Sequence, residues 1–188
     1  MRRCVILLFC LCLLPFWSFS QSTADDKQDD LLGKGHWSVG VSGGGGYGSG
    51  LGVVTNITPR IQYFLADGWA LQAEARYSRT GPDFSYLGGG LSTRYYFLRR
   101  NRLALFGQVG ASVGQHVYSK VEPTDPYRPL SALKGTTWQL TAGAGAQYRL
   151  GARWSIEASV ERSQLKQTYL IPDHSGWQGN IGLSFKLR

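Results

Sequence analysis

The sequence has few of the residues that form disulfides, metal sites and helical membrane spans. Its 188 residues include three cysteines, three histidines and one methionine, and all three cysteines lie within the first twelve positions. Beyond that segment, no apolar run approaches the roughly 20 residues that a membrane-crossing helix needs, which excludes a polytopic helical membrane protein. Charged residues make up only 17% of the chain and hydrophobic residues 43%, which excludes a disordered chain.

The N-terminus has the organisation of a targeting segment. Two arginines precede an almost unbroken apolar run, CVILLFCLCLLPFWSF, which ends in a small-x-small pattern before Gln21. The run is short for an anchor helix, and Pro15 interrupts it. This pattern predicts a cleavable secretory signal peptide over residues 1–20.

The polar and acidic stretch QSTADDKQDDLL then predicts a flexible periplasmic leader over residues 21–33. Removal of the signal peptide takes away every cysteine and two of the 20 basic residues, leaving 18 basic against 12 acidic side chains. We therefore expect no disulfide and no thiolate metal site in the mature chain. No histidine or carboxylate group has metal-ligand spacing, and the basic residues are dispersed, so no metal, cofactor or nucleic-acid partner is predicted.

The remaining sequence is dominated by a period of two. Its 25 glycines and its aromatic fraction of 13% disfavour long helices. Eight segments alternate apolar and polar residues over 7–13 residues each, around the length of about 9–11 residues that a tilted strand needs to cross a bilayer. These segments lie at residues 36–42, 57–65, 69–78, 87–97, 103–114, 138–150, 154–161 and 180–187.

The connections between these segments also alternate. Those after the second, fourth and sixth segments are short, and the others are longer and rich in Gly, Pro and polar residues. We expect the longer ones to be surface loops, including Gly43–Gly50, Ser119–Gly135 and Leu170–Trp177. Short turns on one side and long loops on the other are typical of outer-membrane barrels. The chain is therefore predicted to be all-β, an eight-stranded antiparallel up-and-down transmembrane β-barrel over residues 34–188, with its termini in the periplasm.

One face of the predicted strands is aliphatic in the middle and aromatic near the ends. Aromatic rows around an aliphatic belt are typical of a barrel surface at the two membrane interfaces, whereas the core of a soluble sandwich needs no such segregation. On this basis Tyr86 is also expected near the long-loop end. The predicted interfacial girdle consists of Trp37, Tyr63, Trp69, Tyr95, Trp138, Tyr148, Trp154 and Phe185.

The other face carries Arg, Glu and Gln between Gly and Ser. The interior of an eight-stranded barrel is only wide enough for side chains to fill it, and charges buried there must pair. We expect glycines opposite Arg94 and Arg149 to leave room for these long side chains; the functional alternative to a filled lumen is a selective ion path. The predicted lumen ion-pair network consists of Arg60, Glu74, Arg76, Arg94, Arg149, Glu157 and Glu161.

The signal peptide, the eight alternating segments and stretches such as LGGGLSTRYYFL, LALFGQVGASVG and GNIGLSFKLR resemble the small eight-stranded outer-membrane barrels of the OmpA/OmpX type and of the Bacteroidota-style outer membrane protein beta-barrel domain. The resemblance covers about residues 34–188. It implies a non-enzymatic, porin-like protein of the cell envelope, located in the outer membrane as a monomer. It further implies contact with lipopolysaccharide, with the barrel assembly machinery and, through the loops, with an extracellular ligand. The chain departs from the family in ending on Arg188 rather than on an aromatic residue.

Two other functions remain open at this point. A lipid A-modifying barrel enzyme would need a histidine, a serine and a carboxylate together on the lipid-facing surface. His36, His116 and the Asp173–Ser175 stretch offer candidates, but the His-x-Ser strand motif of such deacylases is absent, so no catalytic residue is predicted. A soluble, secreted lipocalin-like binding barrel would instead need the apolar face to point inward.

Overall fold

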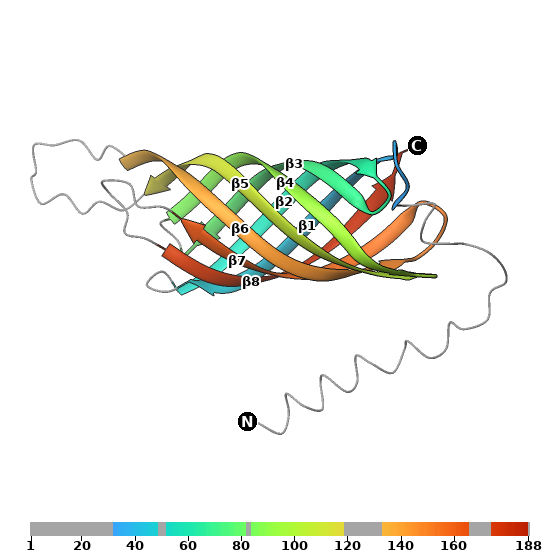
Figure 1. Ribbon diagram of the computed structural model, residues 1–188. Helices are drawn as coiled ribbons and strands as arrows, with labels where there is room; N and C mark the ends of the chain where they lie inside the picture. Colours follow the sequence, from blue (N-terminus) through green and yellow to red (C-terminus); the bar gives the residue numbers. More distant parts are fainter. Residues whose placement is uncertain (1–31, 49–51, 82–83, 119–132, 166–173, 188) are drawn as a thin grey trace, which may run out of the picture.

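The computed structural model describes residues 32–48, 52–81, 84–118, 133–165 and 174–187, so the predicted signal peptide lies outside them. Eight antiparallel strands close into a barrel in sequence order, with the first strand paired to both the second and the last (Figure 1). This confirms the predicted eight-stranded up-and-down barrel. The strands are β1 (Trp37–Gly48), β2 (Gly52–Ala66), β3 (Trp69–Thr80), β4 (Phe84–Arg100), β5 (Leu103–Tyr118), β6 (Leu133–Arg149), β7 (Trp154–Leu165) and β8 (His174–Lys186).

The strand register determines how the barrel closes. Successive pairings that start at Ser38 and run once around the sheet return to β1 at Gly48, ten residues further along. A stagger of this kind requires strands tilted by roughly 35–45° to the barrel axis and leaves an interior that side chains can fill. Residues at one height in the lumen therefore come from different positions along neighbouring strands.

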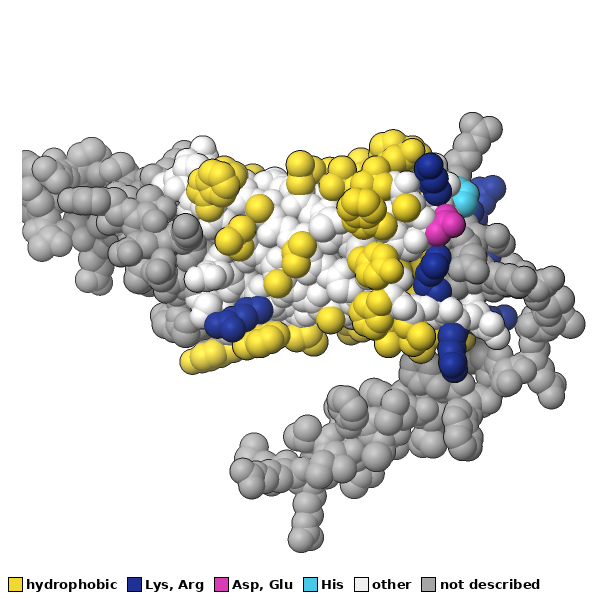
Figure 2. All heavy atoms as spheres, viewed as in Figure 1, with side chains coloured by type: hydrophobic (Ala, Val, Ile, Leu, Met, Phe, Trp, Pro, Cys, Tyr) yellow, Lys and Arg dark blue, Asp and Glu magenta, His cyan; other side chains and the backbone are white. Residues whose placement is uncertain are grey.

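The alternation of the sequence separates an apolar outside from a polar inside. Ile181 and Leu91 are 66% and 61% exposed on the outer face, whereas Arg94 and Glu157 are 1% and 3% exposed in the lumen. Hydrophobic side chains extend over the visible outer face, and basic side chains gather at the end with the short turns (Figure 2). This polarity is the reverse of the one that a lipocalin-like binding barrel needs, so that alternative is wrong. No helix within the described ranges is long and apolar enough to cross a membrane.

The strands run further toward the loop end than the alternation indicates. Gly43–Gly48, expected in a surface loop, belongs to β1 and pairs with both β2 and β8. Backbone pairing needs no side chains, and the lack of a Cβ is itself required here, because a Cβ on Gly46 would come within 2.8 Å of the Cα of Gln178. Only three residues separate β1 from β2, and three separate β3 from β4, so these connections are not long loops. Likewise β8 already begins at His174, within the expected last loop.

The predicted girdle residues lie on the outward face. Rings of neighbouring strands meet at the short-turn end, where the centroids of Trp37 and Tyr63, and those of Trp154 and Phe185, are 4.8 Å apart. Trp138 lies toward the loop end of β6 and is 61% exposed. Tyr86, which was expected on the same face, points into the lumen and is 2% exposed, because it alternates with the outward-facing Leu87.

Candidate functional site

The lumen contains a buried cluster around Glu157 of β7. Its carboxylate forms ion pairs with Arg60 of β2 and with Nη1 of Arg94 of β4, the latter at 2.8 Å. Both guanidinium groups therefore reach across the barrel to one carboxylate. Arg94 also donates from Nε and Nη2 to Oε1 of Gln108, at 3.0 and 2.6 Å. The two positive charges share one negative charge in a site that is almost closed to solvent.

A second cluster lies on the loop side of the first. Nη2 of Arg76 donates to Oε2 of Glu161 at 3.2 Å and to Oε1 of Glu74 at 3.3 Å. Gln108 connects the clusters, because its Nε2 donates to Oε1 of Glu161 at 2.7 Å while its own carbonyl oxygen accepts from Arg94. The network thus spans the lumen, and its three arginines and three glutamates balance in charge.

The structure places the seventh predicted network residue, Arg149, at the short-turn end. Its Nε donates to the carbonyl oxygen of Gly151 at 2.9 Å, in the connection between β6 and β7. The expectation that glycines lie opposite Arg94 and Arg149 is wrong, because Arg94 pairs with Ala70 and Gln108 and Arg149 pairs with Ser155.

Glycines instead lie beside other members of the network. Gly40 pairs with Arg60, and a Cβ there would come within 3.3 Å of its guanidinium group. Gly182 pairs with Glu157, and a Cβ there would meet its carboxylate at 3.2 Å. The space for the long charged side chains is therefore provided by the neighbouring strand at each of these positions.

A cluster of buried, mostly apolar side chains, here called the apolar plug, lies at the short-turn end of the lumen. The ring of Phe106 lies 3.9 Å from the guanidinium carbon of Arg94, so the plug borders the first ion-pair cluster directly. The hydroxyl group of Tyr96 donates to Gln147 at 2.7 Å. Leu32, assigned to the leader from the sequence, is completely buried in this plug. Its members are Leu32, Phe64, Ala70, Tyr96, Ala104 and Phe106.

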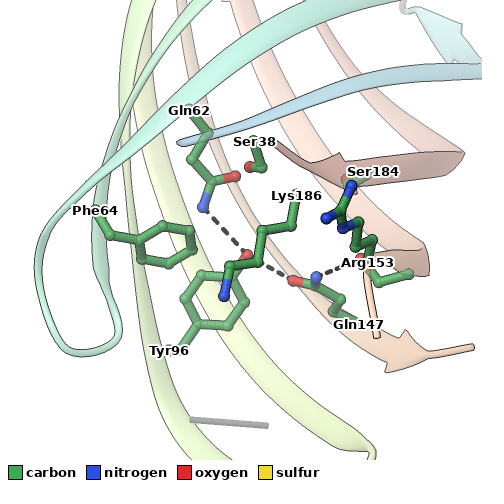
Figure 3. A pocket seen from close by; sticks show the side chains of 9 residues that line it. Ser38, Gln62, Phe64, Tyr96, Gln147, Arg153, Ser184 and Lys186 are labelled. Carbon is green, nitrogen blue, oxygen red and sulfur yellow. Dashed lines mark hydrogen bonds between the residues drawn. The ribbon is translucent and has the colours of Figure 1, made fainter. Parts of the chain in front are cut away.

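Sequence reasoning missed Phe64 and Phe106 as lumen residues, although the signal was present. Phe64 lies two residues beyond Gln62 and Phe106 two residues before Gln108, so each shares the inward parity of a polar neighbour. A small pocket, partly open to solvent, borders the plug and is lined by Phe64 and Tyr96 together with Gln62, Gln147 and Lys186 (Figure 3).

Aromatic side chains also line the opposite, loop-side end of the lumen. His116 of β5 is 3% exposed and its ring lies 4.9 Å from that of Phe84 and 4.8 Å from that of Tyr86. The hydroxyl groups of Tyr86 and Ser112 are 3.1 Å apart. His116 therefore faces the lumen and not the lipid surface. Within the described ranges, no group of three or more His, Cys, Asp or Glu side chains could hold a metal ion.

Solved structures share this architecture. Neisserial surface protein A matches 79% of this chain and 96% of its own length, with a TM-score of 0.64 and 13% identity. OprG from Pseudomonas aeruginosa matches 85% and 99%, with a TM-score of 0.55 and 13% identity. The N-terminal barrel domain of Pseudomonas aeruginosa OprF matches 82% and 100%, with a TM-score of 0.54 and 17% identity. At these identities the likeness establishes the fold alone.

Sequence comparison gives the family. Among curated proteins no sequence matches this chain. The family model described as "Outer membrane protein beta-barrel domain" matches residues 16–188, which include every strand of the barrel. The protein is thus located in the outer membrane, with its aliphatic belt toward lipid. The chain belongs to the outer membrane protein beta-barrel domain family.

Proposed function

We propose that this protein is a non-enzymatic outer-membrane barrel with a lumen closed by its own side chains, which acts as a structural and surface-interaction protein. One observation carries the proposal: the ion-pair network around Glu157 and Glu161 lies directly on the apolar plug around Phe106. Ion-selective channels use rings of side chains that carry the same charge. The arginines and glutamates of this network neutralise one another across the lumen, so they do not form such a ring. A continuous aqueous path would have to displace the plug as well.

Conductance in planar lipid bilayers tests the closed lumen. The purified full chain is expected to give no stepwise currents, and a Phe64→Ala, Phe106→Ala double variant, which shortens only the plug, should also give none, because the ion pairs of Glu157 and Glu161 still cross the lumen. Leu91→Ala, on the lipid face of β4, is the matched control and should stay silent. Stable open-pore currents from the unaltered chain would contradict the proposal.

The position of His116 supports a non-enzymatic role. A deacylase of lipid A needs its histidine on the outer surface, where the acyl chains lie, and His116 is enclosed between Phe84 and Tyr86 inside the barrel. Mass spectra of lipid A from cells with and without the protein provide the test. We expect identical acyl and phosphate patterns, and any change that depends on the protein would favour the enzyme instead.

The outer surface supports a monomer anchored by lipid contacts. The aromatic rows would lie at the two interfaces, and the basic side chains at the short-turn rim would face headgroups of the periplasmic leaflet. These basic side chains include Arg99, Arg100, Arg102 and Arg153. We further propose that lipopolysaccharide surrounds the loop-side half and that the barrel assembly machinery inserts the chain. Cross-linking in native membranes, with a single band at monomer mass as the expected result, tests the oligomeric state.

We propose that external contacts form at the connections that precede β6 and β8, where loops were expected over residues 119–135 and 170–177; β6 and β8 already begin at Leu133 and His174. A structural neighbour, Ail of Yersinia pestis, was solved in complex with the heparin analogue sucrose octasulfate, at a TM-score of 0.50 and 14% identity. By analogy, we propose that the loops of this barrel take an external ligand. Deletion of residues 119–132 should abolish binding of cells to a glycan or host-surface array without altering barrel assembly, and unchanged binding would refute this role for that loop.

A further inference from the structure

One charged side chain lies on the outer face of the barrel next to an exposed indole ring. Arg162 of β7 is exposed, and its guanidinium carbon lies 6.0 Å from the ring centroid of Trp177 on the adjacent strand. Trp177 is itself 60% exposed and pairs directly with Arg162 in the register of β7 and β8.

Nothing in the described parts of the chain neutralises this charge. Their ion pairs all lie in the lumen, and Arg162 forms none with a described residue. Arg79, also exposed on an outward face near the loop end, differs because its Nε donates to the carbonyl oxygen of Gly81 at 3.2 Å. Charged residues that face lipid are rare and costly, and those retained commonly have a functional role.

The depth of Arg162 is set by the strand geometry. It lies eight residues beyond Trp154, which belongs to the aromatic row at the short-turn end. Eight residues span about 26 Å along a strand, or about 20 Å along the membrane normal at the tilt of such barrels. The apolar band of an outer-membrane barrel is about 25 Å tall. The Cα atom of Arg162 is therefore just inside the opposite edge of that band, and its side chain can extend to the headgroups.

We propose that Arg162 and Trp177 form a binding site for the phosphorylated sugar headgroup of an outer-leaflet glycolipid of the lipid A class. A guanidinium group binds a phosphate through two parallel N–H donors, and an indole ring provides a flat apolar face for a sugar ring at the membrane interface. A phospholipid would supply the phosphate but no sugar ring to cover Trp177. The site rests on the proposed orientation, in which the short turns face the periplasm.

Native mass spectrometry of the full-length barrel released from detergent micelles tests the site. The probes are diphosphoryl lipid A, its dephosphorylated form, and phosphatidylglycerol at equal concentration. We expect the unaltered protein to retain one diphosphoryl lipid A molecule. Arg162→Gln should weaken this binding about fivefold or more, the effect of one basic side chain at an anionic surface. Arg162→Lys should retain part of it, and Trp177→Leu should weaken it as well.

Arg79→Gln is the matched control, because it removes a basic side chain from the same end of the outer face. Equal losses for Arg162→Gln and Arg79→Gln would indicate general electrostatic attraction and overturn the site. Equal retention of phosphatidylglycerol and diphosphoryl lipid A would overturn the assignment to a glycolipid. Heat-modifiable gel mobility identifies variants that fail to fold, and Arg162→Lys then keeps the test informative. Labelling a cysteine introduced at Gly81 in intact cells tests the orientation separately.

Discussion

Glu157→Ala should be among the most destabilising substitutions in this barrel. The carboxylate is 3% exposed and forms ion pairs with both Arg60 and Arg94, so its removal leaves two buried guanidinium groups without their counter-charge. Breaking a buried ion pair by removing one partner costs about 3–5 kcal/mol. At a urea dependence of about 2 kcal/mol per molar, the unfolding midpoint should fall by roughly 2 M. The assay is reversible urea unfolding of the detergent-reconstituted barrel, followed by tryptophan fluorescence and by heat-modifiable gel mobility.

Glu74→Ala is the matched control for this experiment. Glu74 contacts Arg76 at 3.3 Å, but Arg76 keeps its ion pair with Glu161 at 3.2 Å when Glu74 is removed. The free energy of unfolding should therefore fall by only about 1 kcal/mol, the contribution of an ordinary hydrogen bond. An unchanged midpoint in Glu157→Ala, or equal shifts in the two variants, would refute the reasoning that Glu157 is the central counter-charge of the lumen.

Three further substitutions test the lumen by the same unfolding assay. Phe106→Ala, in the plug, should cost about 3–5 kcal/mol, and a loss below 1 kcal/mol would mean that the ring is not packed there. Gly143→Ala should lower the free energy of unfolding by about 1–3 kcal/mol, because the added Cβ would come within 2.6 Å of the carbonyl oxygen of Val160. Gly151→Ala is its control: the space around the added Cβ is open, so the free energy of unfolding should change by no more than about 0.5 kcal/mol. Gln108→Ala should lower the free energy of unfolding by about 1–3 kcal/mol, because Arg94 loses two hydrogen bonds and Glu161 loses one, and a neutral result would show that the two clusters are independent.

The sequence predicted the architecture because parity alone decides which face a strand residue occupies. Arg60, Arg94 and Glu157 share the parity of their small polar neighbours, and this places them inside without any knowledge of pairing. The same rule would have placed Phe64, Phe106 and Tyr86 inside. Residue type indicates otherwise for these aromatic side chains, because aromatics are common at the membrane interface. For these three residues, parity is the correct guide.

The partners within the lumen could not be predicted, because they depend on the stagger of the whole barrel. Arg94 on β4 and Glu157 on β7 are three strands apart. Whether they lie at the same height in the lumen depends on the register of each strand pair between them, and these registers add up to a stagger of ten residues around the whole barrel. The glycine-rich Gly43–Gly48 belongs to a strand only because β2 and β8 pair with it on both sides. If that stretch is taken for a loop, β1 ends at Ser42, and too few residues remain to determine the register of β1 with β2 and β8.

The side chains that fill the lumen are stacked in layers, and this stacking restricts where the barrel could acquire a binding site for a solute. From the short-turn end, the lumen is filled first by the apolar packing around Phe106, then by the ion pairs of Glu157 and then by the ion pairs of Glu161. Each of these layers contacts the next. A substitution that enlarged one layer to admit a solute would also expose the charges of its neighbour, so binding and stability would change together. Side chains on the outward faces of the strands lie outside these layers. Arg162 and Trp177 can therefore vary with the surrounding lipid while the lumen network stays unchanged.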